Sequence, residues 1–143
     1  MGKFDAADLQ AYIRSQRLAV VSSVGPAGQP QSALVGIAVS PELEVIFDTT
    51  ADTRKHANLV RDARASVTFT GPDEQTLQLE GMARQVPVSG HQGADLREIY
   101  YANWPDGRSR LEWPSLVYWC ITPRWARYSD FSRGPLIQEL SWP

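Results

Sequence analysis

The chain has 143 residues, with 14 basic and 16 acidic side chains and a formal net charge of −2. This length suits one domain, residues 1–143, that can bury a core without disulfides or metal, and the slight acidity excludes the broad positive surface of a duplex nucleic-acid binder. The only cysteine, Cys120, excludes an intramolecular disulfide and a Cys-rich zinc site. No run approaches the ~18 apolar residues of a membrane span, so we expect a cytoplasmic protein without a membrane or nucleic-acid partner.

The first third of the chain is predicted to form a short helix and three strands joined by tight turns. Asp5 is placed to cap the helix, whose apolar face carries Leu9, Tyr12 and Ile13. Apolar and β-branched runs then alternate with breakers that contain glycine and proline. These runs predict strands over residues 18–24, 32–39 and 43–49, with turns over residues 25–30 and 40–42.

The rest of the chain is predicted to alternate two helices with further strands. Thr53 is placed to cap a helix over residues 53–61. A second helix is expected over residues 91–104, ended by Trp104-Pro105-Asp106-Gly107. The remaining strands are predicted over residues 65–70, 76–88, 115–122 and 125–128.

Together these elements predict a mainly β protein with marginal helices. Six or seven strands joined by short turns favour an antiparallel meander that closes into a barrel over parallel βαβ units. The sequence contains no G-x-G-x-x-G, G-x-x-x-x-G-K or G-x-S-x-G motif, so dinucleotide-fold, P-loop and hydrolase interpretations lose their main support.

The most informative local segment runs from Phe47 to Lys55, where a strand ends in hydroxyl residues and a helix then begins. Arg54 and Lys55 occupy the first turn of that helix, where each cation costs roughly 0.3–1 kcal/mol because the helix dipole is positive there. A bound anion would offset this cost, because free backbone N–H groups, hydroxyls and cations would converge on it. Spacing alone leaves two interpretations open, a phosphate site and a solvated basic helix start.

From the first helix to about Val86, the chain resembles the pyridoxamine 5′-phosphate oxidase-related, flavin-binding split-barrel family. The resemblance rests on the hairpin 25–30, the strand 30–35 and above all the pattern Phe47-x-Thr49-x-x-x-Thr53-Arg54-Lys55-x-x-Asn58-Leu59. The strands Ala65-Ser66-Val67-Thr68-Phe69 and Leu79-Glu80-Gly81-x-Ala83 complete it, and the segment 123–130 is similar to the ending of small members of the family.

The resemblance implies a split barrel of the FMN-binding type, in which a homodimer holds FMN at the subunit interface in two equivalent sites and acts on a small-molecule substrate. The implied phosphate ligands are Thr49, Thr53, Arg54 and Lys55. The residues implied to line the isoalloxazine ring through their backbone are Ser32, Ala33, Leu34 and Val35. Asp48 and Thr50 would flank the ribityl chain, and Thr76 (or Gln75) matches a strand residue that reaches the flavin. Asn58 and Leu59 are expected to fix the helix against the barrel.

The sequence departs from the family's name-giving oxidase in two places. That enzyme carries a basic residue where the strand at Ser32-Ala33 begins, and a C-terminal Arg-Leu-His signature that grips pyridoxal phosphate. This chain has neither, which argues against oxidation of pyridoxamine phosphate. Other members of the barrel family take the deazaflavin F420 or haem, so both are alternatives to FMN.

The other candidate residues favour structural roles. His56 and His91 lack the H-x-x-x-H and H-E-x-x-H spacings, so no metal site is expected. Cys120 lies in an apolar strand and is predicted to be a buried, inert thiol. The tryptophans are expected to build a core or a dimer interface, although one of Trp104, Trp113 or Trp125 could instead cover the outer face of the flavin.

These observations lead to the hypothesis of an FMN-dependent oxidoreductase that acts on an unidentified small molecule, with catalytic residues unassigned. In such a protein the flavin carries the electron chemistry and the chain supplies anchorage and orientation. The alternative from a different class is a flavin carrier or sensor without turnover.

Overall fold

The computed structural model describes residues 5–132 and 136–143. The helices are α1 (Ala6–Arg14), α2 (Arg54–Arg61) and α3 (Ala94–Asn103), and a 3₁₀ helix, η1 (Pro105–Glu112), follows α3. The first strands are β1 (Leu18–Val24), β2 (Pro30–Gly36), β3 (Ala38–Val39) and β4 (Val45–Thr50). The later strands are β5 (Arg64–Thr70), β6 (Gln75–Val86), β7 (Leu116–Asp130) and β8 (Leu136–Ser141). No helix within the described ranges is long and apolar enough to cross a membrane.

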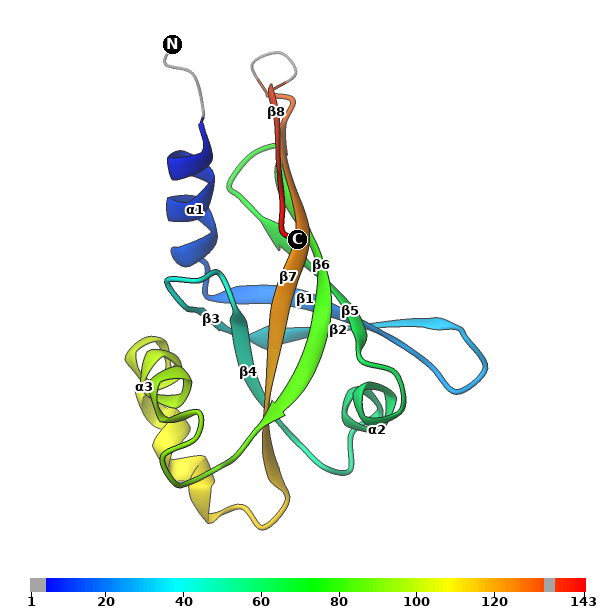
Figure 1. Ribbon diagram of the computed structural model, residues 1–143, viewed down its shortest axis with the longest axis vertical. Helices are drawn as coiled ribbons and strands as arrows, with labels where there is room; N and C mark the ends of the chain where they lie inside the picture. The colour runs from blue at the N-terminus through cyan, green and yellow to red at the C-terminus, as the bar shows by residue number, and fades with distance from the viewer. Residues whose placement is uncertain (1–4, 133–135) are drawn as a thin grey trace.

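All strand pairs are antiparallel, and the sheet follows the order β2-β1-β5-β6-β7-β4-β3, with β8 added to β7. The long strand β7 pairs with three other strands (Figure 1). Along one edge its first half pairs with β4 and its second half with β8, and along the other edge most of its length pairs with β6. The two edge strands β2 and β3 are joined through Ile37 rather than by a full ladder. The predicted fold class, an antiparallel split barrel, is confirmed.

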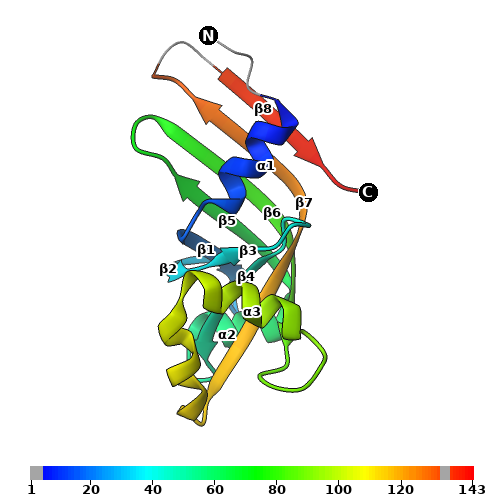
Figure 2. The same ribbon diagram turned by 90° about the vertical axis from the view of Figure 1, so that its left-hand side faces the viewer.

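Two apolar clusters hold this sheet in place. The barrel core gathers alternate residues of β1, β5 and β6 with Phe47 and Trp119, and α1 closes it through Leu9 and Ile13, which are fully buried. The second cluster lies between α3 and the other face of β4 and β7, around Tyr100 and Tyr118. As a result α1 lies at the end of the molecule that carries β8, and α3 lies at the other end beside β4 (Figure 2).

Several predicted boundaries were wrong, and backbone geometry explains them. The strand expected over residues 32–39 is divided at Ile37, and the next strand begins at Val45 because Leu43 adopts a positive φ of 64° in the preceding turn. The helix expected from His91 begins at Ala94, after Gly93 with its φ of 78°. A left-handed residue ends or precedes a regular element, so each of these two residues sets a boundary.

The two C-terminal strands expected over residues 115–122 and 125–128 are one strand, β7. Pro123 lies between the two expected strands, and proline cannot donate to a ladder. In the structure Pro123 pairs with Gly81, and the register with β6 shifts between Glu80 and Gly81, which leaves Arg124 as an extra residue of β7. A Cβ on Gly81 would lie 2.2 Å from the Thr122 carbonyl oxygen, so glycine permits this close approach of the two strands.

The strand β8 was not predicted. Its alternate residues Leu136 and Leu140 pack against the barrel core, with the intervening Ile137 45% exposed. With β8 and the two-residue β3, the described part of the chain has eight strands, against six or seven expected.

Candidate functional site

The turn between β4 and α2 is built by threonine hydroxyls. Thr53 caps α2, because its Oγ1 accepts from the backbone N–H of His56 at 3.4 Å. The same hydroxyl donates to the Thr50 carbonyl at 2.9 Å and lies 3.2 Å from the Thr49 hydroxyl. The last residues of β4 therefore fix where the helix begins and which way its first turn faces.

The first turn of α2 faces β1 and β2 across a pocket of about 170 Å³. Arg54 and Lys55 line one side of it, and residues of the two strands line the other. The strand residues of the pocket are Val21, Ser23, Gln31, Ser32 and Ala33. The structure thus brings two of the predicted phosphate ligands and two of the predicted ring-lining residues to one pocket.

The two cations of this pocket, Arg54 and Lys55, have no carboxylate partner in the part of the chain that the structure describes. Burial lowers the pKa of the Lys55 amino group, which means that its positive charge is incompletely solvated. Two cations at the positive end of a helix, without a carboxylate partner in the described residues and beside a pocket, are an arrangement whose charge an anion would neutralise.

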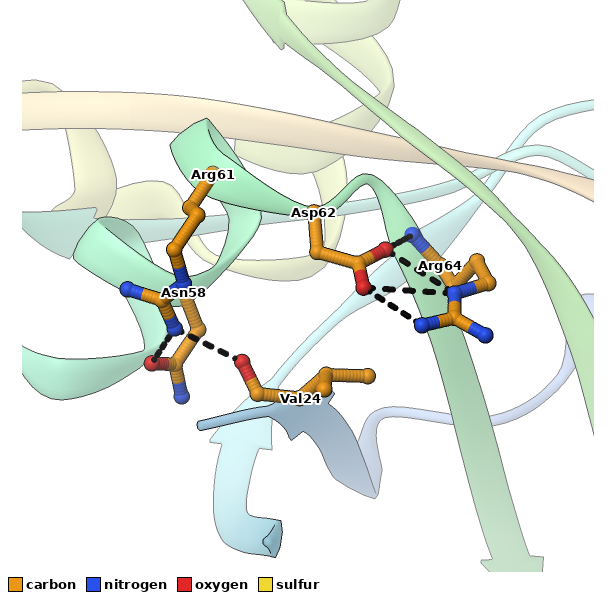
Figure 3. A network of polar contacts seen from close by, with 5 residues as sticks. All are labelled: Val24, Asn58, Arg61, Asp62 and Arg64. Atoms are coloured by element: carbon orange, nitrogen blue, oxygen red, sulfur yellow. Dashed lines mark hydrogen bonds and ion pairs between the residues drawn. The ribbon is translucent and has the colours of Figure 1, made fainter. Parts of the chain in front are cut away.

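The helix that carries these cations is docked by a buried amide. Asn58 is 2% exposed, and its Nδ2 donates to the Ser23 hydroxyl at 3.0 Å and to Gln31 Oε1 at 2.8 Å. Arg61 donates to Asn58 Oδ1 and to the Val24 carbonyl, both at 2.9 Å, and so ties the end of α2 to β1 (Figure 3). Leu59 is also buried, and the predicted anchoring role of Asn58 and Leu59 is confirmed.

The same close-up view shows the contrasting use of arginine just after α2. Arg64, at the start of β5, binds the Asp62 carboxylate through Nε and a terminal nitrogen (Figure 3). These hydrogen bonds hold the pKa of Asp62 at about 2. Arg64 is therefore neutralised locally, whereas Arg54 is not.

The remaining residues predicted to contact the cofactor lie in different environments. Leu34 is 67% exposed on the edge strand β2, whereas Val35 packs against the barrel core. Thr50 donates to the Asp52 carboxylate within its own turn. Asp48, expected beside a ribityl chain, accepts from Arg110 Nε at 2.6 Å.

Thr76 lies far from α2 within one subunit. It pairs with Thr70 and Ser129 at the end of the β5–β6 hairpin, whereas β5 leaves α2 at Arg64. Six residue steps of strand separate Arg64 from Thr70, about 20 Å at the usual rise. Thr76 is not part of the pocket at α2.

Sequence reasoning missed two side-chain contacts of α2, one made by Asn58 with Gln31 and the other by His56 with Trp119. Gln31 lines the pocket and accepts from Asn58, and His56 accepts on Nδ1 from the Trp119 indole N–H at 3.1 Å. In the neutral ring the proton then resides on Nε2. The pairing of His56 with a strand residue 63 positions away could not have been found from local spacing.

Among the other residues considered from the sequence, Trp104 and Cys120 have structural roles. Trp104 packs over Gly36, donates to the Ile37 carbonyl at 3.0 Å and carries Arg17 on its ring at 4.3 Å. Trp113 is 51% exposed. Cys120 is fully buried, and burial together with Glu44 raises the pKa of its thiol to about 12, which confirms the predicted inert cysteine. No group of three potential metal ligands occurs within the described residues.

Comparisons with known proteins agree with this geometry. The family model described as pyridoxamine 5′-phosphate oxidase matches residues 6–130. No curated protein matches the chain.

Solved structures share the fold at low sequence identity. A pyridoxamine 5′-phosphate oxidase-related, FMN binding protein from Nostoc punctiforme has a TM-score of 0.68 and 14% identity, covering 97% of this chain and 89% of that one. A heme binding protein from Mycobacterium smegmatis has a TM-score of 0.76 and 15% identity. The match covers 92% of this chain and 56% of the heme binding protein, so this chain spans just over half of that protein's length. An F420 reductase has a TM-score of 0.64 and 16% identity, and the match covers 82% of this chain and 94% of the reductase.

The match over residues 6–130 covers the pocket, the helix α2 and the whole sheet except β8. At identities this low, the solved structures establish the fold and leave the cofactor to be decided by the residues of this chain. The chain belongs to the pyridoxamine 5′-phosphate oxidase-related split-barrel family.

Proposed function

We propose that the chain binds FMN and acts as an oxidoreductase on a small molecule. The observation that carries this proposal is the pocket of Arg54 and Lys55, two cations without a counter-charge in the described residues, at the start of α2 and against β1 and β2. A phosphate monoester supplies the double negative charge that such a pocket lacks. The family membership and the FMN binding protein of the same fold favour FMN over other phosphate esters.

The residues divide the work of binding. Arg54 and Lys55 would hold the phosphate, together with the backbone N–H groups of the first turn of α2. Thr53 would fix the turn through its cap, and Ser32 and Ala33 would line the adjoining wall. When bound, FMN supplies hydride and single-electron transfer, while the protein anchors and orients it.

We further propose that the site is completed in a homodimer. Thr76 lies about 20 Å along the sheet from the strand residue nearest α2, so it would reach a flavin only from a partner subunit. The exposed Leu34 on the edge strand β2 is a suitable apolar contact for that partner. Light scattering on a sizing column tests this arrangement, and a mass of one chain at micromolar concentration would contradict it.

The absorption spectrum of the purified protein tests the choice of cofactor. Flavin bands at their usual positions support FMN. The heme binding protein and the F420 reductase of the same fold define the competing outcomes, which are a Soret band or tight reconstitution with F420 in place of FMN. The arrangement of Arg54 and Lys55 serves any phosphate ester, so reconstitution with each compound separates the cases.

Mutation of the two cations tests the pocket itself. Arg54→Ala with Lys55→Ala should weaken FMN binding by roughly 3–6 kcal/mol, because each charge-assisted hydrogen bond contributes about 1.5–3 kcal/mol. Riboflavin, which lacks the phosphate, should bind almost unchanged. Arg14→Ala, an exposed cation in the last turn of α1, is the matched control. If the double variant retains FMN as tightly as the wild type, the assignment of the pocket is wrong.

Turnover separates an oxidoreductase from a flavin carrier. The FMN-loaded protein should be reduced by NAD(P)H, or reoxidised by oxygen, at a rate different from that of free FMN. Equal rates with bound and free FMN would favour the carrier or sensor.

A further inference from the structure

The end of β4 presents different side chains to its two faces. Phe47 belongs to the barrel core, whereas Ile46 belongs to the cluster under α3. Because side chains alternate along a strand, Asp48 points with Ile46 toward α3, and Thr49 points with Phe47 toward α2. Helices α2 and α3 lie on opposite sides of β4 and β7 (Figure 1).

Asp48 is held by an arginine from the α3 side. Arg110, in η1, donates from Nε to Asp48 Oδ2 at 2.6 Å, and the two side chains are only 17% and 14% exposed. Arg110 also donates to Asp106 Oδ2 at 2.9 Å and to the Tyr100 hydroxyl at 3.1 Å. One guanidinium therefore joins η1, α3 and β4.

Asp48 lies directly before the turn between β4 and α2, the turn that leads to Arg54 and Lys55. Thr49 follows Asp48 directly, and its hydroxyl lies 3.2 Å from that of Thr53, the cap of α2. Thr53 in turn precedes Arg54 and Lys55. A displacement of Asp48 would move the hydroxyl on which the cap of α2 rests, because neighbouring residues of a strand cannot shift independently.

We propose that Arg110 is a positioning residue of the anion pocket: by pairing with Asp48 it neutralises a mostly buried carboxylate and fixes the end of β4 from which Thr49 and the cations of α2 are placed. This inference rests on the proposed function only for the identity of the anion. Arg110 lies on the opposite side of β4 from the pocket and does not line it.

The test compares Arg110→Met with a matched control, Arg108→Met. Arg108 also joins η1 to α3, through an exposed ion pair with Glu98 at 2.6 Å, but it does not contact β4. A third variant, Arg110→Met with Asp48→Asn, removes both charges and so leaves no unpaired buried carboxylate. It keeps the test possible if Arg110→Met alone fails to fold.

The first readout needs no ligand. Hydrogen exchange of the backbone amides of Thr53, His56 and Ala57, which the cap and first turn of α2 protect, should quicken by about tenfold in Arg110→Met and stay unchanged in Arg108→Met. The double variant should restore most of the protection. Amides in the middle of β5 and β6 serve as the internal control for global unfolding.

The second readout is the ratio of FMN to riboflavin affinity, which a general loss of stability would not move. We expect this ratio to fall by about tenfold in Arg110→Met and to recover in the double variant. Unchanged exchange and an unchanged ratio in folded Arg110→Met would overturn the inference, and so would a double variant no better than the single one. Wild-type protein that binds no FMN would overturn the proposed function alone, since the exchange readout would still decide the role of Arg110.

Discussion

The cations on the two sides of β4 differ in whether a carboxylate neutralises them. On the α3 side, Arg110 donates to two carboxylates and a tyrosine hydroxyl. On the α2 side, Arg54 and Lys55 meet no carboxylate within the described ranges, and they stand where the helix dipole disfavours them. The paired, mostly buried cation contributes to the fold, whereas the cations beside the pocket have no such role and are the ones proposed to bind a ligand.

This contrast separates stability from binding. Removal of the paired cation should lower the free energy of unfolding, because it leaves the mostly buried Asp48 carboxylate without its counter-charge. Removal of the unpaired cations should lower the affinity for a phosphate ester and leave stability nearly intact. Variants on the two sides of β4 therefore test whether the loss of stability and the loss of affinity are separate effects.

The largest effect on stability is expected for Arg110→Met. It should lower the free energy of unfolding by about 3 kcal/mol, at the lower end of the cost of breaking a buried pair because both side chains keep some exposure. Urea denaturation measures this loss. Arg108→Met should cost less than about 1 kcal/mol because its ion pair is exposed, and equal losses in the two variants would break the contrast.

The next effect concerns the anchor of α2 rather than its charges. Asn58→Ala should lower the free energy of unfolding by about 2 kcal/mol, because the buried Ser23 hydroxyl and Gln31 lose their donor. Thermal or chemical denaturation gives the value. Val60→Ala, at an exposed position of the same helix, serves as the control and should change stability by less than about 0.5 kcal/mol.

A smaller loss is expected at the helix cap. Thr53→Ala removes the acceptor of the His56 N–H and should cost about 1 kcal/mol. Thr53→Ser keeps the hydroxyl and should retain most of the stability. If the alanine and serine variants are equally stable, the Thr53 hydroxyl does not contribute to the free energy of unfolding.

The smallest effect has the opposite sign. Lys55→Met should raise the free energy of unfolding of the ligand-free protein at pH 7, by about 0.5 kcal/mol, because a cation leaves the first turn of a helix. The pKa of Lys55 is lowered in the folded protein, so the unfolded chain binds that proton more tightly and the charge opposes folding below the folded pKa. The gain should therefore be full at neutral pH and fade as pH rises through that pKa. A gain that persists at high pH would show that charge is not its cause.

The sequence anticipated the parts of the fold that local chemistry controls. The cap of α1 by Asp5, the cap of α2 by Thr53 and the antiparallel β1–β2 hairpin all follow from residues a few positions apart. The failures came where a distant strand compensates for a local breaker. Pro123 lies inside β7 where the register with β6 shifts, opposite Gly81, which is 42 positions earlier in the chain, and no local pattern reveals that.

The candidate site divides in the same manner. The sequence placed Arg54 and Lys55 together at a helix start, because adjacent residues of one helical turn must be close. That no carboxylate of the described residues pairs with these two cations could not be predicted. Asp48 is only six positions from Arg54, but it lies on the other face of β4, where it accepts a hydrogen bond from Arg110. Likewise the hydrogen bond between His56 and Trp119 joins residues 63 positions apart, so it could not be predicted from local spacing.

Local sequence is enough to locate the cations, the hydroxyls and the helix start of this protein along the chain, because capping and alternation act over a few residues. Which charges are neutralised, and which face a pocket, is a result of how the chain packs. This result depends on how β4 is sandwiched between α2 and α3, and ion pairing between residues 62 positions apart is settled by packing rather than by sequence distance.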